Sequence, residues 1–180
     1  MGEKKVSIII PAYNEEETIA EIISRIKALH AKAEIIVIND GSTDNTAAAA
    51  LESGASVYNH PYNIGNGAAV KSGIRAATGD ILIFMDGDGQ HDPEDIQKLL
   101  DYFPQYDMVV GSRSQNGQAS YWRAFGNTIY NWFASYVAKF SVKDLTSGFR
   151  AVKSDILKIL FFLAIIDFVI IFFHCRSLYH

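Results

Sequence analysis

The sequence predicts an α/β fold with a doubly wound, mostly parallel sheet. Apolar runs of strand length alternate along the chain with short helical patterns, as expected of strands that crossover helices bury on both faces. Polar clusters follow most of these runs, and doubly wound sheets bind ligands beyond the carboxyl ends of their strands. The clusters are AYNEEE, NDGSTD, DGDGQ and GSRS. We therefore expect the four clusters to converge on one ligand-binding edge of the sheet.

Five apolar runs predict the strands. Four of them are rich in isoleucine, valine or leucine, and the third along the chain is shorter and more polar. The expected strands cover residues 6–11, 34–40, 56–60, 80–86 and 107–113.

Four helical patterns lie between or after the expected strands. Asn14 is expected to cap the first helix, with the acidic residues 15–17 in its first turn, where the helix dipole favours negative charge. The apolar face of that helix has helical spacing and consists of Ile19, Ile22, Ile23 and Ile26. The other expected helices cover residues 43–53, with Ser42, Thr43 or Asp44 as the cap, and residues 65–79, and the last one starts at Pro93.

The composition is that of a globular protein. The chain has 180 residues, 49% of them hydrophobic and 20% charged, which suits one domain with a sizeable core. A net charge of −4 argues against a nucleic-acid partner held by bulk electrostatics. With Cys175 as the single cysteine, no internal disulfide framework or thiolate metal cluster can form, and a cytoplasmic location is expected. The first apolar run stops at Pro11, too early for a signal peptide.

Two segments of the last third admit more than one interpretation. Aromatic residues at helical spacing in 121–140 indicate a core-facing helix or a helix at a lipid interface. Residues 156–173 are almost continuously apolar, interrupted by Lys158 and Asp167. As a helix they would span about 27 Å, slightly less than the ~30 Å of a bilayer core. A core helix, a surface-lying segment and a spanning helix therefore all remain open, the last two implying a location at the cytoplasmic face of a membrane.

Asp86 and Asp88 are the strongest candidates for chemistry. They follow an apolar run directly, lie two residues apart and alternate with glycines, which let the backbone bend around a ligand. Two hard oxygen ligands suit Mg²⁺ or Mn²⁺, which complete their shells with water and substrate phosphates. His91 is a candidate further ligand and also stands where a helix-loop-helix calcium site needs glycine. The alternative is a plain turn with solvated aspartates.

Other residues carry weaker signals. Asp40, at the end of an expected strand, could accept hydrogen bonds from a ribose or a base. Gly65 and Gly67 open a helix that could approach a phosphate, but Val70 breaks the dinucleotide-binding fingerprint. Three arginines are candidates for anionic groups, because guanidinium matches phosphate bidentately: Arg113, Arg123 and Arg150. The histidines other than His91 are expected to be exposed or terminal, and no Ser-His-Asp arrangement is expected.

Six stretches resemble the family 2 glycosyltransferases, in particular the branch that transfers sugars to polyprenol or dolichol phosphates and includes dolichol-phosphate mannosyltransferases. They are VSIIIPAYNEEETI, IIVINDGSTDNT, NIGNGAAVKSGI, ILIFMDGDGQHDPEDI, VVGSR and DLTSGFRAV, and they run in the family's order from Val6 to about Val152. The resemblance implies a GT-A fold and inverting transfer of a sugar from a nucleotide-diphosphate sugar, such as a UDP- or GDP-sugar. A lipid phosphate is the acceptor it implies first.

The resemblance also implies roles for individual residues. Those that would line the base, ribose and sugar sites are Pro11, Tyr13, Glu15, Ile38, Asp40 and Gly87. Asp86, Asp88 and Gln90 would hold Mg²⁺ or Mn²⁺ on the donor diphosphate. Arg113 would lie near the phosphates, and Arg123 and Ser147 would face the acceptor. Asp144 is the candidate general base if the acceptor is a sugar hydroxyl. Asn39 stands where many relatives have an aspartate.

The resemblance ends near residue 153. Relatives continue with a further helix, a strand and a basic loop that closes over the donor phosphates, whereas this chain continues into an apolar tail. We therefore expect a glycosyltransferase domain over residues 1–153, incomplete at its C-terminal end, followed by a tail over residues 154–180. Two functions fit these motifs, a metal-dependent sugar transferase and a non-catalytic nucleotide-sugar-binding remnant that needs a partner chain. A sugar nucleotidyltransferase fits less well, because a Gly-rich basic loop after the first strand is missing.

Overall fold

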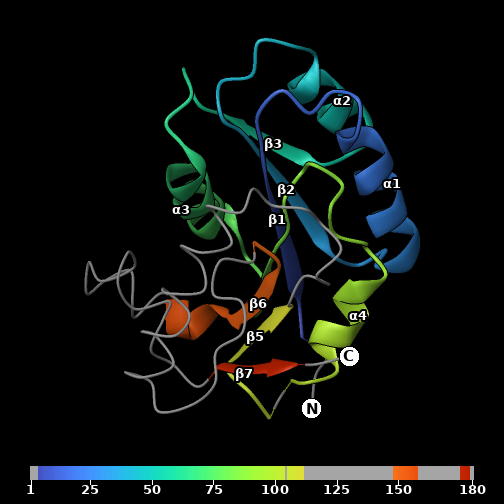
Figure 1. Cartoon of the computed structure of the whole chain (residues 1–180), viewed down its shortest axis with the longest axis vertical. Coiled ribbons are helices and arrows are strands. Elements are labelled where there is room, and N and C mark those ends of the chain that lie inside the picture. The colour runs from blue at the N-terminus through green and yellow to red at the C-terminus, as the bar shows by residue number, and fades with distance from the viewer. Residues whose placement is uncertain (1–3, 104, 112–147, 158–174, 179–180) are drawn as a thin grey trace, which may run out of the picture.

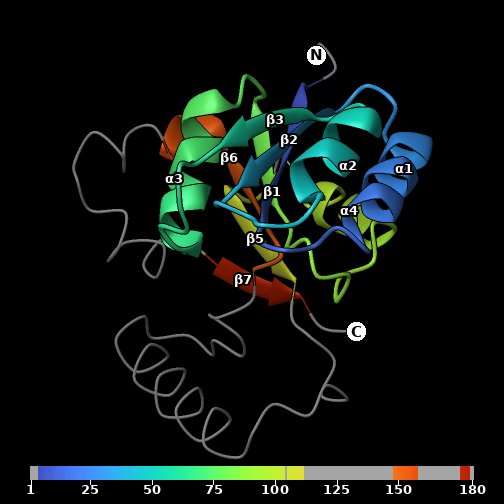
Figure 2. The same ribbon diagram turned by 90° about the horizontal axis from the view of Figure 1, so that it is seen from above.

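The computed structural model describes residues 4–103, 105–111, 148–157 and 175–178. These residues form one central sheet with helices on both faces (Figure 1). Helices α1 (Ile19–Leu29), α2 (Thr46–Glu52) and α4 (Asp95–Leu100) cover one face, and α3 (Asn66–Ala76) covers the other (Figure 2). The predicted doubly wound α/β fold is therefore confirmed.

The sheet has seven strands in the order β3-β2-β1-β4-β6-β5-β7. Their bounds are β1 Val6–Ala12, β2 Glu34–Asn39, β3 Ser56–Asn59, β4 Ile81–Phe84, β5 Met108–Gly111, β6 Arg150–Lys153 and β7 Cys175–Leu178. Neighbouring strands run parallel except where β6 pairs with β4 and β5. The sheet is thus mostly parallel, and the carboxyl ends of β1, β2 and β4 meet at one edge.

Alternation along β1 explains why its apolar run is continuous. Ile8 and Ile10 point into the core shared with α1 and α2, whereas Ile9 points into the core beneath α3, and all three are fully buried. Gly73 lies against Ile9 in the middle of α3, where an added Cβ would overlap the isoleucine side chain. This close approach explains a glycine inside a helix, where it otherwise costs about 1 kcal/mol relative to alanine.

Strand β6 was not predicted from the sequence. The strand has only four residues, RAVK, and a charged residue stands at each end of its apolar centre. The sequence therefore shows no apolar run of strand length. It is antiparallel and lies between β4 and β5, in register Phe84↔Arg150 and Val110↔Arg150. Strand β7 was not predicted either, and it pairs with β5 at the edge of the sheet.

The prediction that Asn14 caps the first helix is wrong. Helix α1 begins at Ile19, after a turn in which the N–H groups of Thr18 and Ile19 both donate to Glu15 O. Asn14 instead has a left-handed backbone (φ 56°), and its side chain accepts a hydrogen bond from Thr43 N. The acidic residues 15–17 therefore precede the helix, because contacts with a neighbouring loop override the local capping signal.

Helix α2 begins at Thr46 and its N-cap position is Asn45, so the prediction that Ser42, Thr43 or Asp44 caps it is wrong. Asp44 precedes the cap and accepts a hydrogen bond from Thr46 N. Pro93 lies in the turn just before α4.

The helix expected over residues 121–140 lies outside the described residues, as does most of the apolar segment 156–173. Within the described ranges, no helix is both long and apolar enough to cross a membrane. The domain boundary near residue 153 stays a prediction.

Candidate active site

Three of the four polar clusters meet at the carboxyl-end edge of the sheet. Asp40 N donates to Ala12 O (2.9 Å), and Met85 N donates to Ile9 O (3.1 Å), so the chains that leave β1, β2 and β4 start side by side. The fourth cluster follows β5 and lies, beyond Gly111, outside the described residues. The structure therefore brings together the AYNEEE, NDGSTD and DGDGQ clusters.

The loops after β1 and β2 are joined by reciprocal hydrogen bonds. Asn14 N donates to Ser42 Oγ (3.0 Å), and Asn14 Oδ1 accepts from Thr43 N (2.8 Å). Glu15 N donates to Thr46 Oγ1 (2.8 Å) at the start of α2. These bonds satisfy backbone groups that have no partner in the sheet, so the two loops form one framework.

The loop after β4 carries Asp86 and Asp88. Gly148, which precedes β6, lies directly against the Asp86 carboxylate, because an added Cβ would overlap Asp86 Oδ2. Gly87 is buried beside Pro11 O. Asp88 is exposed and accepts a hydrogen bond from the backbone N of Gln90 (2.9 Å). One carboxylate is thus held against the sheet, and the next lies at the surface.

Helix α1 holds this loop from the side. Thr18 Oγ1 donates to Gly87 O at 2.7 Å, and the same hydroxyl lies 3.3 Å from Glu15 Oε2. Further along α1, Arg25 forms an ion pair with Asp92 (2.5 Å). Both partners of that pair are substantially exposed, so it contributes little stability. Thr18, at the N-cap position of α1, thus links the helix directly to the Asp86–Asp88 turn.

The carboxylates of these loops share one negative field. Burial raises the pKa of Glu15, the hydrogen bond from Thr18 opposes that rise, and the charges of Asp88, Asp44 and Asp86 add to it. Burial is the largest of these causes, and the three like charges act in the same direction because they disfavour ionisation of Glu15.

A divalent cation fits this donor set. Asp86 and Asp88 offer hard oxygen atoms on one loop, and their charges add to that of Glu15, which suits Mg²⁺ or Mn²⁺. His91 does not complete a cluster with them: within the described residues, no three carboxylate, imidazole or thiolate groups are placed to hold a metal ion together. Its ring stacks on Phe149, with centroids 5.1 Å apart. Two protein carboxylates would therefore need oxygen atoms from another source, such as Gln90 or a substrate.

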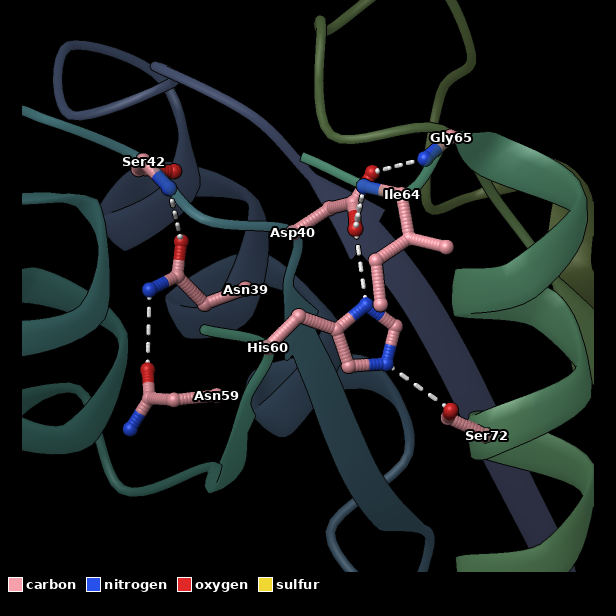
Figure 3. Close-up of polar contacts among 8 residues, drawn as sticks. All are labelled: Asn39, Asp40, Ser42, Asn59, His60, Ile64, Gly65 and Ser72. Carbon is pink, nitrogen blue, oxygen red and sulfur yellow. Dashed lines mark hydrogen bonds and ion pairs between the residues drawn. The ribbon is translucent and has the colours of Figure 1, made fainter. Parts of the chain in front are cut away.

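Asp40 has a different environment, shown in Figure 3. Its Oδ1 lies 2.7 Å from His60 Nδ1 and accepts a hydrogen bond from Ile64 N (3.0 Å), and its Oδ2 accepts one from Gly65 N (2.7 Å). His60 Nε2 lies 2.8 Å from Ser72 Oγ on α3. Burial alone would raise the pKa of Asp40, but these hydrogen bonds and the nearby histidine lower it. This carboxylate is satisfied by the protein itself.

The expectation that His60 is exposed, and that no Ser-His-Asp arrangement exists, is therefore wrong. The His60 side chain is only 12% exposed. Asp40 directly follows β2, His60 directly follows β3, and Ser72 lies on α3. They are separated by 20 and 12 positions in the chain, so only strand pairing and helix packing bring them together. No sequence motif of fixed spacing signals the arrangement.

The remaining predicted residues lie at several depths. Tyr13 is 45% exposed at the edge, and Pro11 is half-buried at the end of β1. Ile38 is fully buried in the core under α3, where it supports the edge from beneath. Arg150 is half-buried on β6. Those that lie outside the described residues are Arg113, Arg123, Asp144 and Ser147.

A hollow of about 820 Å³ lies at the opposite edge of the sheet. Its lining includes Lys4, Lys5 and Lys32 above an apolar floor that contains Val6 and Ile81. None of the predicted site residues borders it.

Comparison with known sequences agrees with this geometry. The family model described as glycosyl transferase family 2 matches residues 7–161. An uncharacterized protein of Methanocaldococcus jannaschii is 32% identical over 88% of this chain and 68% of its own length. The undecaprenyl-phosphate 4-deoxy-4-formamido-L-arabinose transferase of Proteus mirabilis is 32% identical over 85% of this chain. The chain spans 50% of the length of that transferase.

Solved structures share the fold. The glucosyl-3-phosphoglycerate synthase of Mycobacterium tuberculosis aligns with a TM-score of 0.71 and 25% identity, over 86% of this chain and 59% of that one. A second structure of the same enzyme, with Mn²⁺, UDP and phosphoglyceric acid, aligns over 97% of this chain and 68% of that one, with a TM-score of 0.73 and 22% identity.

Proposed function

Because the chain belongs to glycosyl transferase family 2, we propose that it transfers a sugar from a UDP- or GDP-sugar to a polyprenyl or dolichyl phosphate by metal-assisted inverting transfer. One observation carries the proposal. Asp86 and Asp88 lie at the carboxyl-end edge of a doubly wound sheet, and their charges add to the burial that raises the pKa of Glu15. Two carboxylates on one loop at this edge suit a divalent cation that carries a diphosphate.

On the donor side, the loop after β1 provides the nucleotide wall. The half-exposed ring of Tyr13 is available to a base, and Pro11 and Glu15 lie beside it on the same segment. Asp40 and Ile38 support this wall from beneath, since both side chains are almost completely buried. These residues bind and orient the donor.

The metal site uses Asp86, Asp88 and Gln90. When bound, Mg²⁺ or Mn²⁺ supplies Lewis-acid stabilisation of the charge that develops on the leaving nucleoside diphosphate. Gly148 and Thr18 hold the turn in place, the first by its close fit to Asp86 and the second through Gly87 O. The solved complex of the mycobacterial enzyme with Mn²⁺ and UDP supports the use of a divalent cation.

The acceptor determines whether a base is needed. A lipid phosphate is already ionised at neutral pH, so its oxygen attacks the anomeric carbon without a strong general base. Arg113 would neutralise phosphate charge, and Arg123 and Ser147 would orient the acceptor. If the acceptor were a sugar hydroxyl, Asp144 would be the candidate base. The Proteus mirabilis relative, named for undecaprenyl phosphate, supports the lipid-phosphate acceptor.

The test is calorimetric titration of the purified chain with UDP- and GDP-sugars, with Mn²⁺ or with EDTA, followed by transfer assays with undecaprenyl phosphate. We expect binding that depends on Mn²⁺ and transfer to the lipid phosphate. Binding without transfer would instead identify a nucleotide-sugar-binding module that needs a partner chain. A folded chain that binds no nucleotide sugar would contradict the proposal.

A further inference from the structure

The Asp40–His60–Ser72 line connects three elements beside the candidate site. His60 directs one ring nitrogen to the carboxylate at the end of β2 and the other to a hydroxyl on α3 (Figure 3). Asp40 is 4% exposed. The orientation of the imidazole ring is therefore fixed through both nitrogens.

This line controls the position of one loop, residues 60–65. The loop leaves β3 and turns back over the end of β2, where Ile64 N and Gly65 N donate to the two oxygens of Asp40. On the same side, Gly41 packs against the backbone of Tyr62 and Asn63 so closely that an added Cβ would overlap it. The loop backbone is thus held against the β2 end by Asp40, whose own position His60 fixes.

The same loop presents apolar side chains to the surface. Tyr62 is 67% exposed and Ile64 is 47% exposed, although the backbone that carries them is firmly held. A rigid loop that displays an aromatic ring binds a planar or apolar group at a low cost in conformational entropy.

The arrangement does not suit a hydrolytic triad. Ser72 lies inside α3, so its own amide is engaged in the helix and is not available to stabilise an oxyanion. The carboxylate also accepts two backbone N–H groups in addition to the imidazole, as expected of a group that organises a loop. The geometry favours positioning over nucleophilic catalysis.

We propose that His60 is a positioning residue for the donor nucleotide: through Asp40 it holds residues 60–65 as a wall of the nucleotide site, and it thereby sets donor affinity and not the rate of transfer. The inference rests on the proposed function. It follows from the place of the loop, because Asp40 at its base also donates its N–H to Ala12 O at the end of β1, next to Tyr13.

Three substitutions separate the two bonds of the imidazole. His60→Asn keeps an amide N–H near the position of Nδ1 and so retains the bond to Asp40. His60→Gln extends its amide towards Ser72, and His60→Ala removes both bonds. We expect the Kd for the UDP- or GDP-sugar that the wild type binds with Mn²⁺ to rise about tenfold in His60→Ala and His60→Gln, which corresponds to one lost charge-assisted hydrogen bond. His60→Asn should stay within about threefold of the wild type.

Two further readouts exclude a merely structural effect. When the donor is varied at a saturating concentration of acceptor, KM for the donor should rise while kcat changes less than about twofold. The reason is that the loop contacts the donor equally in the ground state and in the transition state. Amide exchange should show loss of protection at Ile64 and Gly65 in His60→Ala but not in His60→Asn. His30→Ala, at the opposite edge of the sheet, is the matched control and should leave Kd unchanged.

The outcomes separate this inference from the proposed function. A wild-type chain that binds no nucleotide sugar contradicts the proposed function, and the inference falls with it. Wild-type binding that His60→Ala leaves unchanged overturns the inference alone, as does a fall in kcat at constant KM. If His60→Ala does not fold, His60→Gln repeats the test, and unchanged donor affinity in His60→Gln overturns the inference.

Discussion

Carboxylates follow two strands of the same sheet edge, and their environments are opposite. After β2, Asp40 is buried and accepts hydrogen bonds from His60 and two backbone N–H groups, and its pKa is lowered. After β4, Asp88 is exposed, and its charge and that of Asp86 add to the burial that raises the pKa of Glu15. The protein fills the first carboxylate with its own donors, whereas Asp88 of the second pair is exposed to a ligand.

The contrast shows how one residue type serves two purposes at equivalent places. A carboxylate that accepts several hydrogen bonds from its own chain organises a loop, whereas two carboxylates on an accessible loop offer oxygen ligands to a cation. Substitutions at or beside each carboxylate test these two roles.

The largest effect is expected at the end of β4. Asp88→Ala removes one of two carboxylates from the metal site, so metal-dependent donor binding should weaken at least a hundredfold, about 2.8 kcal/mol. Calorimetry with and without Mn²⁺ measures it. Asp101→Ala, an exposed aspartate at the end of α4, is the control. Unchanged affinity of Asp88→Ala in Mn²⁺ would show that Asp88 is not a metal ligand.

Asp40→Asn should act on stability. The amide presents N–H groups where the protein already supplies donors, so the free energy of unfolding should fall by about 2–4 kcal/mol in urea titrations. Because the pKa of Asp40 is lowered by folding, its stabilising effect is present above the unfolded pKa of about 3.9 and is lost as pH falls through the folded pKa. The difference between the variant and the wild type should therefore shrink below about pH 4. A difference independent of pH would contradict this account.

Gly148→Ala tests how closely β6 supports the metal turn. The added Cβ would overlap the Asp86 carboxylate, which must then move. We expect donor affinity in Mn²⁺ to fall about tenfold, since metal ligands tolerate little displacement. Affinity measured in EDTA should change little, and equal losses in both conditions would indicate general damage to the fold.

Thr18→Val removes one hydroxyl without changing the shape of the side chain. Gly87 O then loses the hydrogen bond from helix α1, and we expect a loss of donor affinity of about threefold to tenfold. Thr18→Ser keeps the hydroxyl and should restore most of the affinity in the same titration. If valine and serine behave alike, the hydrogen bond does not position the turn.

The smallest effect is expected from Asp88→Asn, which removes a charge and leaves the fold unchanged. Asp88→Asn removes one of the charges that raise the pKa of Glu15, so that pKa should move down towards its ordinary value. Carbon-detected NMR titration of the glutamate carboxyls measures the shift. Addition of Mg²⁺ to the wild type should move the pKa in the same direction, and an upward movement in either experiment would contradict the shared negative field.

Much of the fold was predictable because its signals are local. The apolar runs that became β1, β2 and β4 are buried on both faces, so they appear as continuous hydrophobic sequence. The turn that contains Asp86 and Asp88 was also predictable from local sequence, because two charged residues directly follow a buried strand. Strand β6 escaped prediction because four residues with charged ends form a strand only where β4 and β5 offer partners.

The sequence by itself determined the alternation of strands and helices, the doubly wound class and the edge at which polar residues gather, since each follows from periodicity within a few residues. Tertiary structure alone decided that Asn14 serves a neighbouring loop and not a helix cap, that Gly148 lies against Asp86, and that His60 connects Asp40 with Ser72. These contacts join residues from different elements. They form only after the sheet has brought these elements together, so no local pattern in the sequence predicts them.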